Sequence, residues 1–168
     1  MTKGLLVIIL GLVSFKSMGQ NQTDSLAGGY HHWTKDRTLL RLGTGIQKSF
    51  YYELGISRHK YIHNYYSYIT TNYYTSTAWT PNGNILEIKA GYELNLSIIA
   101  IGLEGKYQTN FEKNDFVLTP KIGLGLFGLL NIFYGYNIST NNRPFVNIGQ
   151  NQVSLAINFG KKYLKEIW

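Results

Sequence analysis

The sequence predicts an all-β protein, a closed antiparallel up-and-down β-barrel of about eight strands. Apolar and polar residues alternate with a period of two over most of the chain, which is the pattern of strands with two different faces. No later segment reaches the ~18 consecutive apolar residues of a transmembrane helix. The 168 residues include 14 Tyr and 18 Gly but only 3 Pro, which is typical of strands joined by tight turns.

The alternation falls into seven segments of about nine to eleven residues, the length of strands that cross a bilayer at a tilt. They are Arg37–Gln47, Phe50–His59, Ile85–Leu94, Ile98–Gln108, Phe116–Leu126, Leu130–Ile138 and Gln152–Gly160. An even count requires one more strand, and Leu26–Trp33 is the candidate before Arg37. The connections 48–49, 95–97 and 127–129 are tight, whereas 60–84, 109–115 and 139–151 are longer. Short turns at one end and longer loops at the other are typical of outer-membrane barrels.

The N-terminus has the pattern of a secretory signal peptide. Lys3 precedes an apolar run from Leu5 to Val13, and the small residues Ser17 and Gly19 precede the expected cleavage site. The run is short for a membrane-spanning helix, and an N-terminal anchor or a buried helix is the alternative reading. The expected organisation is a signal peptide at 1–19 followed by an outer-membrane β-barrel at 20–168.

Composition excludes several classes of site. The chain has no Cys, so it can form neither a disulfide nor a thiolate metal site, and its 4 His show no recognisable zinc spacing. We therefore expect no metal and no cofactor. The net charge of +7 comes from scattered Lys and Arg rather than from one basic helix or stripe, so we expect no nucleic-acid partner.

The polar face of the strands combines glycine with balanced charge. Glycines recur on it, as in Gly43, Gly45, Gly123 and Gly125, and small residues suit the crowded interior of a narrow barrel. The same face carries four cations and four anions: Arg41, Lys89, Lys106, Lys121, Glu53, Glu87, Glu93 and Glu104. Buried charges must be paired, and a balanced set can be paired inside a barrel. These residues are the predicted barrel-interior charge network.

The apolar face carries aromatic residues near the strand ends. They are Tyr52, Tyr92, Tyr107, Phe116, Tyr136 and Phe159, and they are the predicted lipid-interface aromatics. With the signal peptide, both faces favour a transmembrane barrel whose apolar stripe contacts lipid. A secreted, soluble, calycin-like barrel that binds a small apolar ligand is the alternative, because balanced charges also suit an exposed face.

Four segments carry a resemblance to a known family. They are Leu39–Gly45, Pro120–Leu126, Tyr134–Asn137 and Val153–Phe159. Through them, residues 25–160 or so resemble the small eight-stranded outer-membrane β-barrel proteins of Gram-negative bacteria. The resemblance implies location in the cell outer membrane, with its lipid and lipopolysaccharide as surroundings. It also implies recognition by the barrel-insertion machinery of an aromatic residue in the last strand. Phe159 fits that role, and Trp168, after a basic tail, is its rival.

Segment 60–84 is the most distinctive predicted loop. Its aromatic residues, which form the proposed surface contact loop, are Tyr61, Tyr65, Tyr66, Tyr68, Tyr73, Tyr74 and Trp79. Loops rich in Tyr, Ser and Asn are good contact surfaces, since large rings combine with adaptable hydrogen bonding. The alternative is that this segment extends its neighbouring strands as a hairpin. Basic residues expected at the outer rim are Lys35, Arg37, Arg58, Lys60, Lys113 and Arg143.

We expect no catalytic residues. Ser57 and His59 share the polar face, but two residues apart on one strand is usually too far for a hydrogen-bonded nucleophile and base. The leading functional hypothesis is a structural or surface-contact barrel with an interior filled by side chains. A lipid A-modifying barrel enzyme is the third hypothesis, after the soluble ligand-binding barrel.

Overall fold

The structure is a computed structural model that describes residues 36–64 and 67–160. Within these ranges the strands are β1 (Arg37–Asn64), β2 (Ser67–Thr80), β3 (Ile85–Leu96), β4 (Ile99–Thr109), β5 (Asn114–Leu126), β6 (Leu130–Tyr136), β7 (Ile138–Ser139) and β8 (Ile148–Phe159). The described residues contain no helix that is long and apolar enough to cross a membrane. The predicted signal peptide and the predicted strand Leu26–Trp33 lie outside them.

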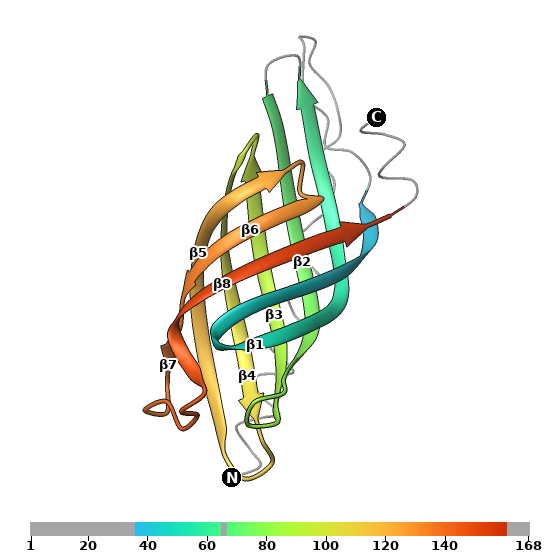
Figure 1. Cartoon of the computed structure of the whole chain (residues 1–168). Coiled ribbons are helices and arrows are strands. Elements are labelled where there is room, and N and C mark those ends of the chain that lie inside the picture. The colour runs from blue at the N-terminus through green and yellow to red at the C-terminus, as the bar shows by residue number, and fades with distance from the viewer. Residues whose placement is uncertain (1–35, 65–66, 161–168) are drawn as a thin grey trace, which may run out of the picture. The chain divides into compact units, whose positions relative to one another are not determined.

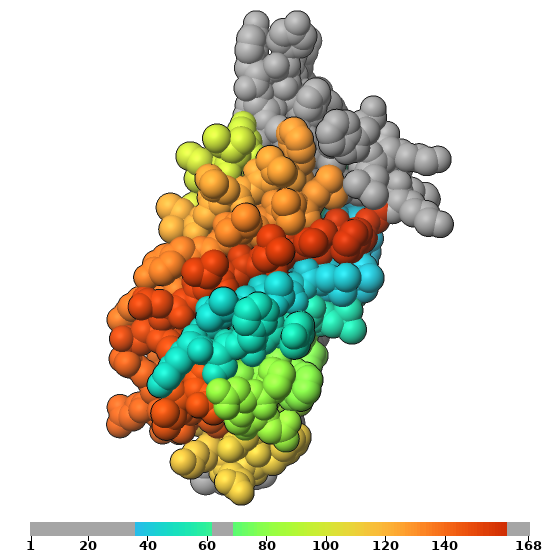
Figure 2. All heavy atoms as spheres, in the orientation of Figure 1, coloured from blue at the N-terminus to red at the C-terminus, as the bar shows by residue number. Residues whose placement is uncertain are grey.

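The strands form one closed antiparallel sheet. Their order is β4-β3-β2-β1-β8-β6-β5-β7, and the additional pairing of β4 with β5 closes the ring. The first strand meets the last, because Leu40 lies opposite Phe159. In Figure 2, β8 and the first part of β1 lie side by side as adjacent bands. The closed antiparallel barrel predicted from the alternation is therefore confirmed.

β1 supplies two of the barrel's eight strands, because it doubles back on itself (Figure 1) and its two arms pair with different neighbours. Its first arm, up to residue 47, pairs with β8, and its second arm, from residue 50, pairs with β2. Lys48 has a φ of 74°, and the Thr44 hydroxyl donates to the Tyr51 carbonyl at 2.9 Å across the turn. The remaining barrel strands are β2, β3, β4, β5, β6 with its short continuation β7, and β8.

The prediction of a loop over 60–84 is wrong. β1 continues to Asn64, and β2 occupies Ser67–Thr80, so this segment supplies the strand that completes the eight. Its alternation is hard to see in the sequence because both faces are polar: Thr75 and Thr77 point outward, while Asn72 and Ser76 point inward. The turn after β2 does use the expected residues, with Gly83 at a φ of 94°.

The extra strand changes which connections share an end of the barrel. The end that we call the hairpin end carries turns 48–49, 81–84 and 110–113 and the loop 140–147. The terminal end carries Arg37, Phe159 and turns 97–98 and 127–129. The sequence-based grouping of 48–49 with the other tight turns is therefore wrong.

The two faces of the barrel are inverted relative to a water-soluble protein. Aliphatic side chains point outward, as in Leu54 and Leu124, whose exposed fractions are 58% and 63%. Charged side chains point inward, as in Lys89 and Glu93, which are fully buried. Among the described residues that are buried, polar and charged types outnumber apolar ones. The barrel core is thus a polar network enclosed by an apolar outer surface.

Candidate functional site

The eight charged residues of the predicted network form one connected series inside the barrel. Neighbours in this series are within ion-pair distance and alternate in sign: Glu87, Lys89, Glu53, Arg41, Glu93, Lys121, Glu104 and Lys106. We call it the ion-pair series. The distances between paired nitrogen and oxygen atoms range from 2.8 to 3.5 Å. Because every cation lies between or beside anions, the buried charge is compensated locally as well as in total.

Glu93, on β3, is the centre of the series. Its carboxylate accepts hydrogen bonds from Arg41 at 2.8 and 3.2 Å and from Lys121 at 2.8 Å. Asn72 and Asn131 donate to the same carboxylate at 2.9 and 3.3 Å. These donors come from β1, β5, β2 and β6, so one side chain joins strands from around the barrel. Charge-assisted hydrogen bonds of this kind are the stronger ones in proteins.

Two tyrosines complete the interior and were missed by sequence reasoning. The ring of Tyr74 lies 3.8 Å from the Arg41 guanidinium, and the ring of Tyr51 lies 3.9 Å from the Lys89 ammonium. The Tyr74 hydroxyl donates to Glu104 and accepts from Lys121. Both rings add cation–π contacts to the series. Tyr51 continues the inward row of the second arm, with Glu53 and Ser57, and this periodicity is the signal that would have placed it inside.

Around Lys106, at one end of the ion-pair series, the partners are amides. Its ammonium donates to Asn137 at 2.8 Å, to Gln152, and to Gln47 at 3.5 Å. Gln47 in turn donates to Glu87. The interior around Lys106 is therefore lined by polar side chains that hydrogen-bond to one another.

Glycines face the interior tyrosines at two positions. A Cβ atom on Gly91 would lie 2.5 Å from the Tyr74 ring, and one on Gly45 would lie 2.7 Å from the Tyr51 ring. Real Cβ contacts are not this short, so the rings occupy space that only glycine leaves free.

We expect Gly91→Ala to lower the free energy of unfolding by about 1–3 kcal/mol, because the methyl group displaces Tyr74 from Glu104 and Lys121. Gly105→Ala is the matched control on the next strand. Its Cβ would point outward and meet nothing nearer than 3.5 Å, so its stability is expected to stay near that of the wild type. Urea unfolding of the two variants measures the difference. Equal losses would contradict a role for the ring contact.

The six predicted lipid-interface aromatics all point outward. Tyr107 lies opposite Phe116 near the hairpin end, and Tyr52 lies opposite Trp79 there. Tyr136, at the end of β6, also lies toward the hairpin end, whereas Phe159 lies at the terminal end. Tyr92 contacts Tyr73, with ring centroids 4.7 Å apart. Four of the six rings therefore lie toward the hairpin end and one lies at the terminal end, whereas Tyr92 lies between Ile88 and Leu96 along β3.

The described aromatic residues of segment 60–84 lie on strands and not in a surface contact loop. Tyr61 and Tyr74 are buried, while Tyr73 and Trp79 point outward from β2. Tyr65 and Tyr66 lie outside the described residues, and so does the side chain of Tyr68. Of the four aromatic side chains described in this segment, two therefore point into the barrel and two point outward.

Ser57 and His59 are closer than their spacing on one strand predicts. The His59 Nε2 atom lies 3.2 Å from the Ser57 hydroxyl, which is itself hydrogen-bonded to the Asn158 amide oxygen at 3.0 Å. Residues two apart on a strand are separated by about 6.6 Å, and the length of an imidazole spans that gap. Both side chains are buried, with no more than 2% exposed, so a substrate has no route to the serine in this structure.

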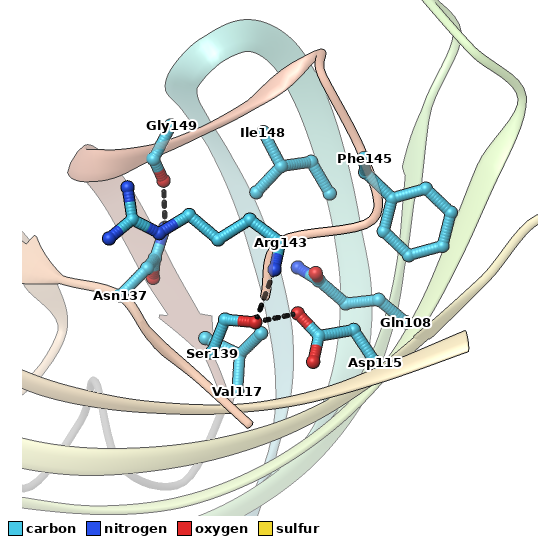
Figure 3. A pocket seen from close by; sticks show the side chains of 9 residues that line it. All are labelled: Gln108, Asp115, Val117, Asn137, Ser139, Arg143, Phe145, Ile148 and Gly149. Atoms are coloured by element: carbon cyan, nitrogen blue, oxygen red, sulfur yellow. Dashed lines mark hydrogen bonds between the residues drawn. The ribbon is translucent and has the colours of Figure 1, made fainter. Parts of the chain in front are cut away.

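The loop 140–147 lies at one side of the hairpin end. Figure 3 shows Phe145 and Ile148 over Gln108 and Asp115 around the small pocket at this end. The Asp115 carboxylate holds the loop by accepting from the Ser139 hydroxyl at 2.6 Å and from the backbone N–H of Asn141 at 3.1 Å. The pocket has a volume of about 10 Å³, which is room for one water molecule.

The basic residues predicted at one rim lie at both ends. Arg37, Arg58 and Lys60 are toward the terminal end, whereas Lys113 and Arg143 are at the hairpin end. Lys35 lies outside the described residues. The prediction of one basic outer rim is therefore wrong. The additional strand β2 places the residues that precede it at the end of the barrel opposite to the one expected.

No group of His, Asp or Glu in the described part of the chain is arranged to hold a metal ion. In comparisons with protein-family models, with curated proteins and with solved structures, nothing matches this chain.

Proposed function

We propose that this chain is a small outer-membrane β-barrel with a closed, side-chain-filled interior and a structural, non-catalytic role in a Gram-negative cell envelope. The observation that carries the proposal is the inverted polarity of the barrel. Outward residues such as Leu54, Ile88 and Leu124 are exposed, whereas all eight members of the ion-pair series are buried. Exposed apolar surface on this scale is unfavourable in water and favourable in lipid.

The interior argues against the alternative of a soluble, calycin-like barrel. Such a barrel needs an apolar cavity for its ligand, with its polar face toward water. Here the interior is occupied by charged and amide side chains, and the pocket at the hairpin end holds about one water molecule. The part of the interior that the structure describes thus presents charged and amide groups, which do not favour a small apolar ligand.

The proposal assigns no surface-contact role to segment 60–84, since its described part is strand. It also includes no reaction. The Ser57–His59 hydrogen bond resembles a catalytic pair, and both of its members are enclosed by the barrel wall.

Cell fractionation and gel migration test the proposal together. Expressed with its N-terminal segment in a Gram-negative host, the chain is expected in the outer-membrane fraction. It is also expected to migrate faster on gels when unheated than when boiled, because a closed barrel resists detergent until heated. Recovery in the soluble fraction without detergent would overturn the proposal and favour the ligand-binding barrel. Recovery in the inner membrane would indicate that residues 1–19 act as an anchor.

A further inference from the structure

The outward row of the second arm of β1 changes character abruptly. Tyr52, Leu54 and Ile56 occupy successive outward positions, and Arg58 and Lys60 continue the same row. Successive members of such a row are about 6.6 Å apart. The apolar outer surface therefore passes directly into a pair of cations on the same strand.

The two cations share one anion. The Arg58 Nε atom lies 3.0 Å from one oxygen of Asp36, and the Lys60 Nζ atom lies 3.4 Å from the other. The Arg58 and Lys60 side chains remain 65% and 50% exposed. We call these three residues the terminal-end basic cluster, and its net charge is +1. Exposed ion pairs contribute little to stability, so the fold does not require this cluster.

Aromatic side chains lie beside the cluster on the same outer surface. Arg58 lies directly opposite Tyr73 on β2, and Tyr73 contacts Tyr92 on β3. Tyrosines with exposed rings are typical of the level at which acyl chains meet headgroups. Along β1 the outward row thus passes from aliphatic residues to cations, with the two tyrosine rings beside the first cation on the neighbouring strands, which matches a lipid acyl chain below a phosphate headgroup.

We propose that Arg58 and Lys60 bind the phosphate headgroup of an anionic glycerophospholipid in the leaflet at the terminal end. Tyr73 and Tyr92 lie against the upper part of the same lipid. The inference rests on the proposed function, because it requires the apolar surface to lie in a bilayer. Continuity of the cations with that surface favours a lipid over a free phosphate ion. Asp36 competes with the phosphate for both cations.

Titration of the folded full chain in a zwitterionic detergent tests this proposal. Short-chain phosphatidylglycerol and phosphatidylcholine are added separately, and native mass spectrometry counts the lipids that remain bound. We expect phosphatidylglycerol to bind more tightly than phosphatidylcholine. Arg58→Gln with Lys60→Gln is expected to weaken phosphatidylglycerol binding by about fivefold for each cation removed. Asp36→Asn is expected to act in the opposite direction and to tighten it.

The matched control removes the same number of cations from the opposite end, as Lys48→Gln with Lys113→Gln. Both residues are exposed at the hairpin end, and this variant is expected to keep the preference for phosphatidylglycerol. Equal loss in the two double variants would overturn the proposal in favour of a general charge effect. Equal binding of the two lipids by the wild type would also overturn it, as would displacement of phosphatidylglycerol by equimolar inorganic phosphate.

Gel migration of unheated samples separates this inference from the proposed function. A chain that inserts into vesicles and migrates as a folded barrel, but shows no lipid preference, overturns the headgroup site alone. A chain that does not insert at all overturns the outer-membrane proposal.

Exchange of the two cations, Arg58→Lys with Lys60→Arg, keeps the charge and is expected to retain binding.

Discussion

Replacing Glu93 with Gln is expected to lower the free energy of unfolding of the barrel by about 3–5 kcal/mol. The substitution keeps the shape of the side chain but removes the anion between Arg41 and Lys121, which are both within 2.8 Å of it. Two buried cations then lose their shared partner in a region that water does not reach. Urea titration of the protein folded into lipid vesicles, followed by fluorescence and by gel migration, measures the loss.

The control for this prediction lies at the end of the ion-pair series. Glu104→Gln with Lys106→Met removes one charge of each sign and leaves six residues that still alternate. Its cost is therefore expected to be smaller than that of the single change at Glu93, although it alters two residues. If the double variant were the less stable of the two, charge compensation along the series would not be what stabilises the interior.

Membership of this network could be predicted from the sequence, but its connections could not. Alternation and charge balance identified the inward-facing Lys, Arg and Glu residues. Which of them meet depends on how the strands are staggered around the barrel, and period two carries no information about that stagger. Arg41 contacts Glu93 across 52 positions of sequence. Tyr74 was assigned to the surface because its strand was interpreted as a loop.

Placing a charge on the outer surface is the second change with a large expected effect. Leu103, near the middle of β4, is 49% exposed, so Leu103→Arg creates no clash and breaks no contact of the polar interior. In water such a change is close to neutral. In a bilayer it is expected to cost about 2–4 kcal/mol, because the guanidinium must leave the hydrocarbon or draw water into it. Urea unfolding of the protein in vesicles measures this cost.

Val146→Arg is the matched control, since Val146 is 78% exposed in the loop at the hairpin end. An arginine there lies beyond the apolar surface and is expected to change stability by less than about 0.5 kcal/mol. Similar small effects at both positions would show that the outer surface is not in lipid, and the outer-membrane proposal would fail.

The fold was more predictable than the site, because most strands have one aliphatic and one polar face. Where one face is aliphatic and the other polar, as in β3, β4 and β5, the expected and observed boundaries differ by about two residues or fewer. β2 was missed because threonine occupies outward positions that aliphatic residues hold elsewhere. Its partner β1 was also expected to end at His59, five residues before its observed end at Asn64. The strands were therefore predicted from the difference in hydrophobicity between their two faces, and not from the strand propensity of their residues.

The donors to Glu93 come from four different strands, and this constrains the order in which the barrel can fold. A hairpin of β3 and β4 alone would expose this carboxylate, because its cationic partners are supplied by β1 and β5. The pairing between the first arm of β1 and β8 also cannot be completed until the chain has been synthesised as far as residue 159, which pairs with residue 40. On the outer-membrane proposal, entry of single hairpins into hydrocarbon would expose unpaired charges, so we expect the strands and the polar side chains between them to insert together.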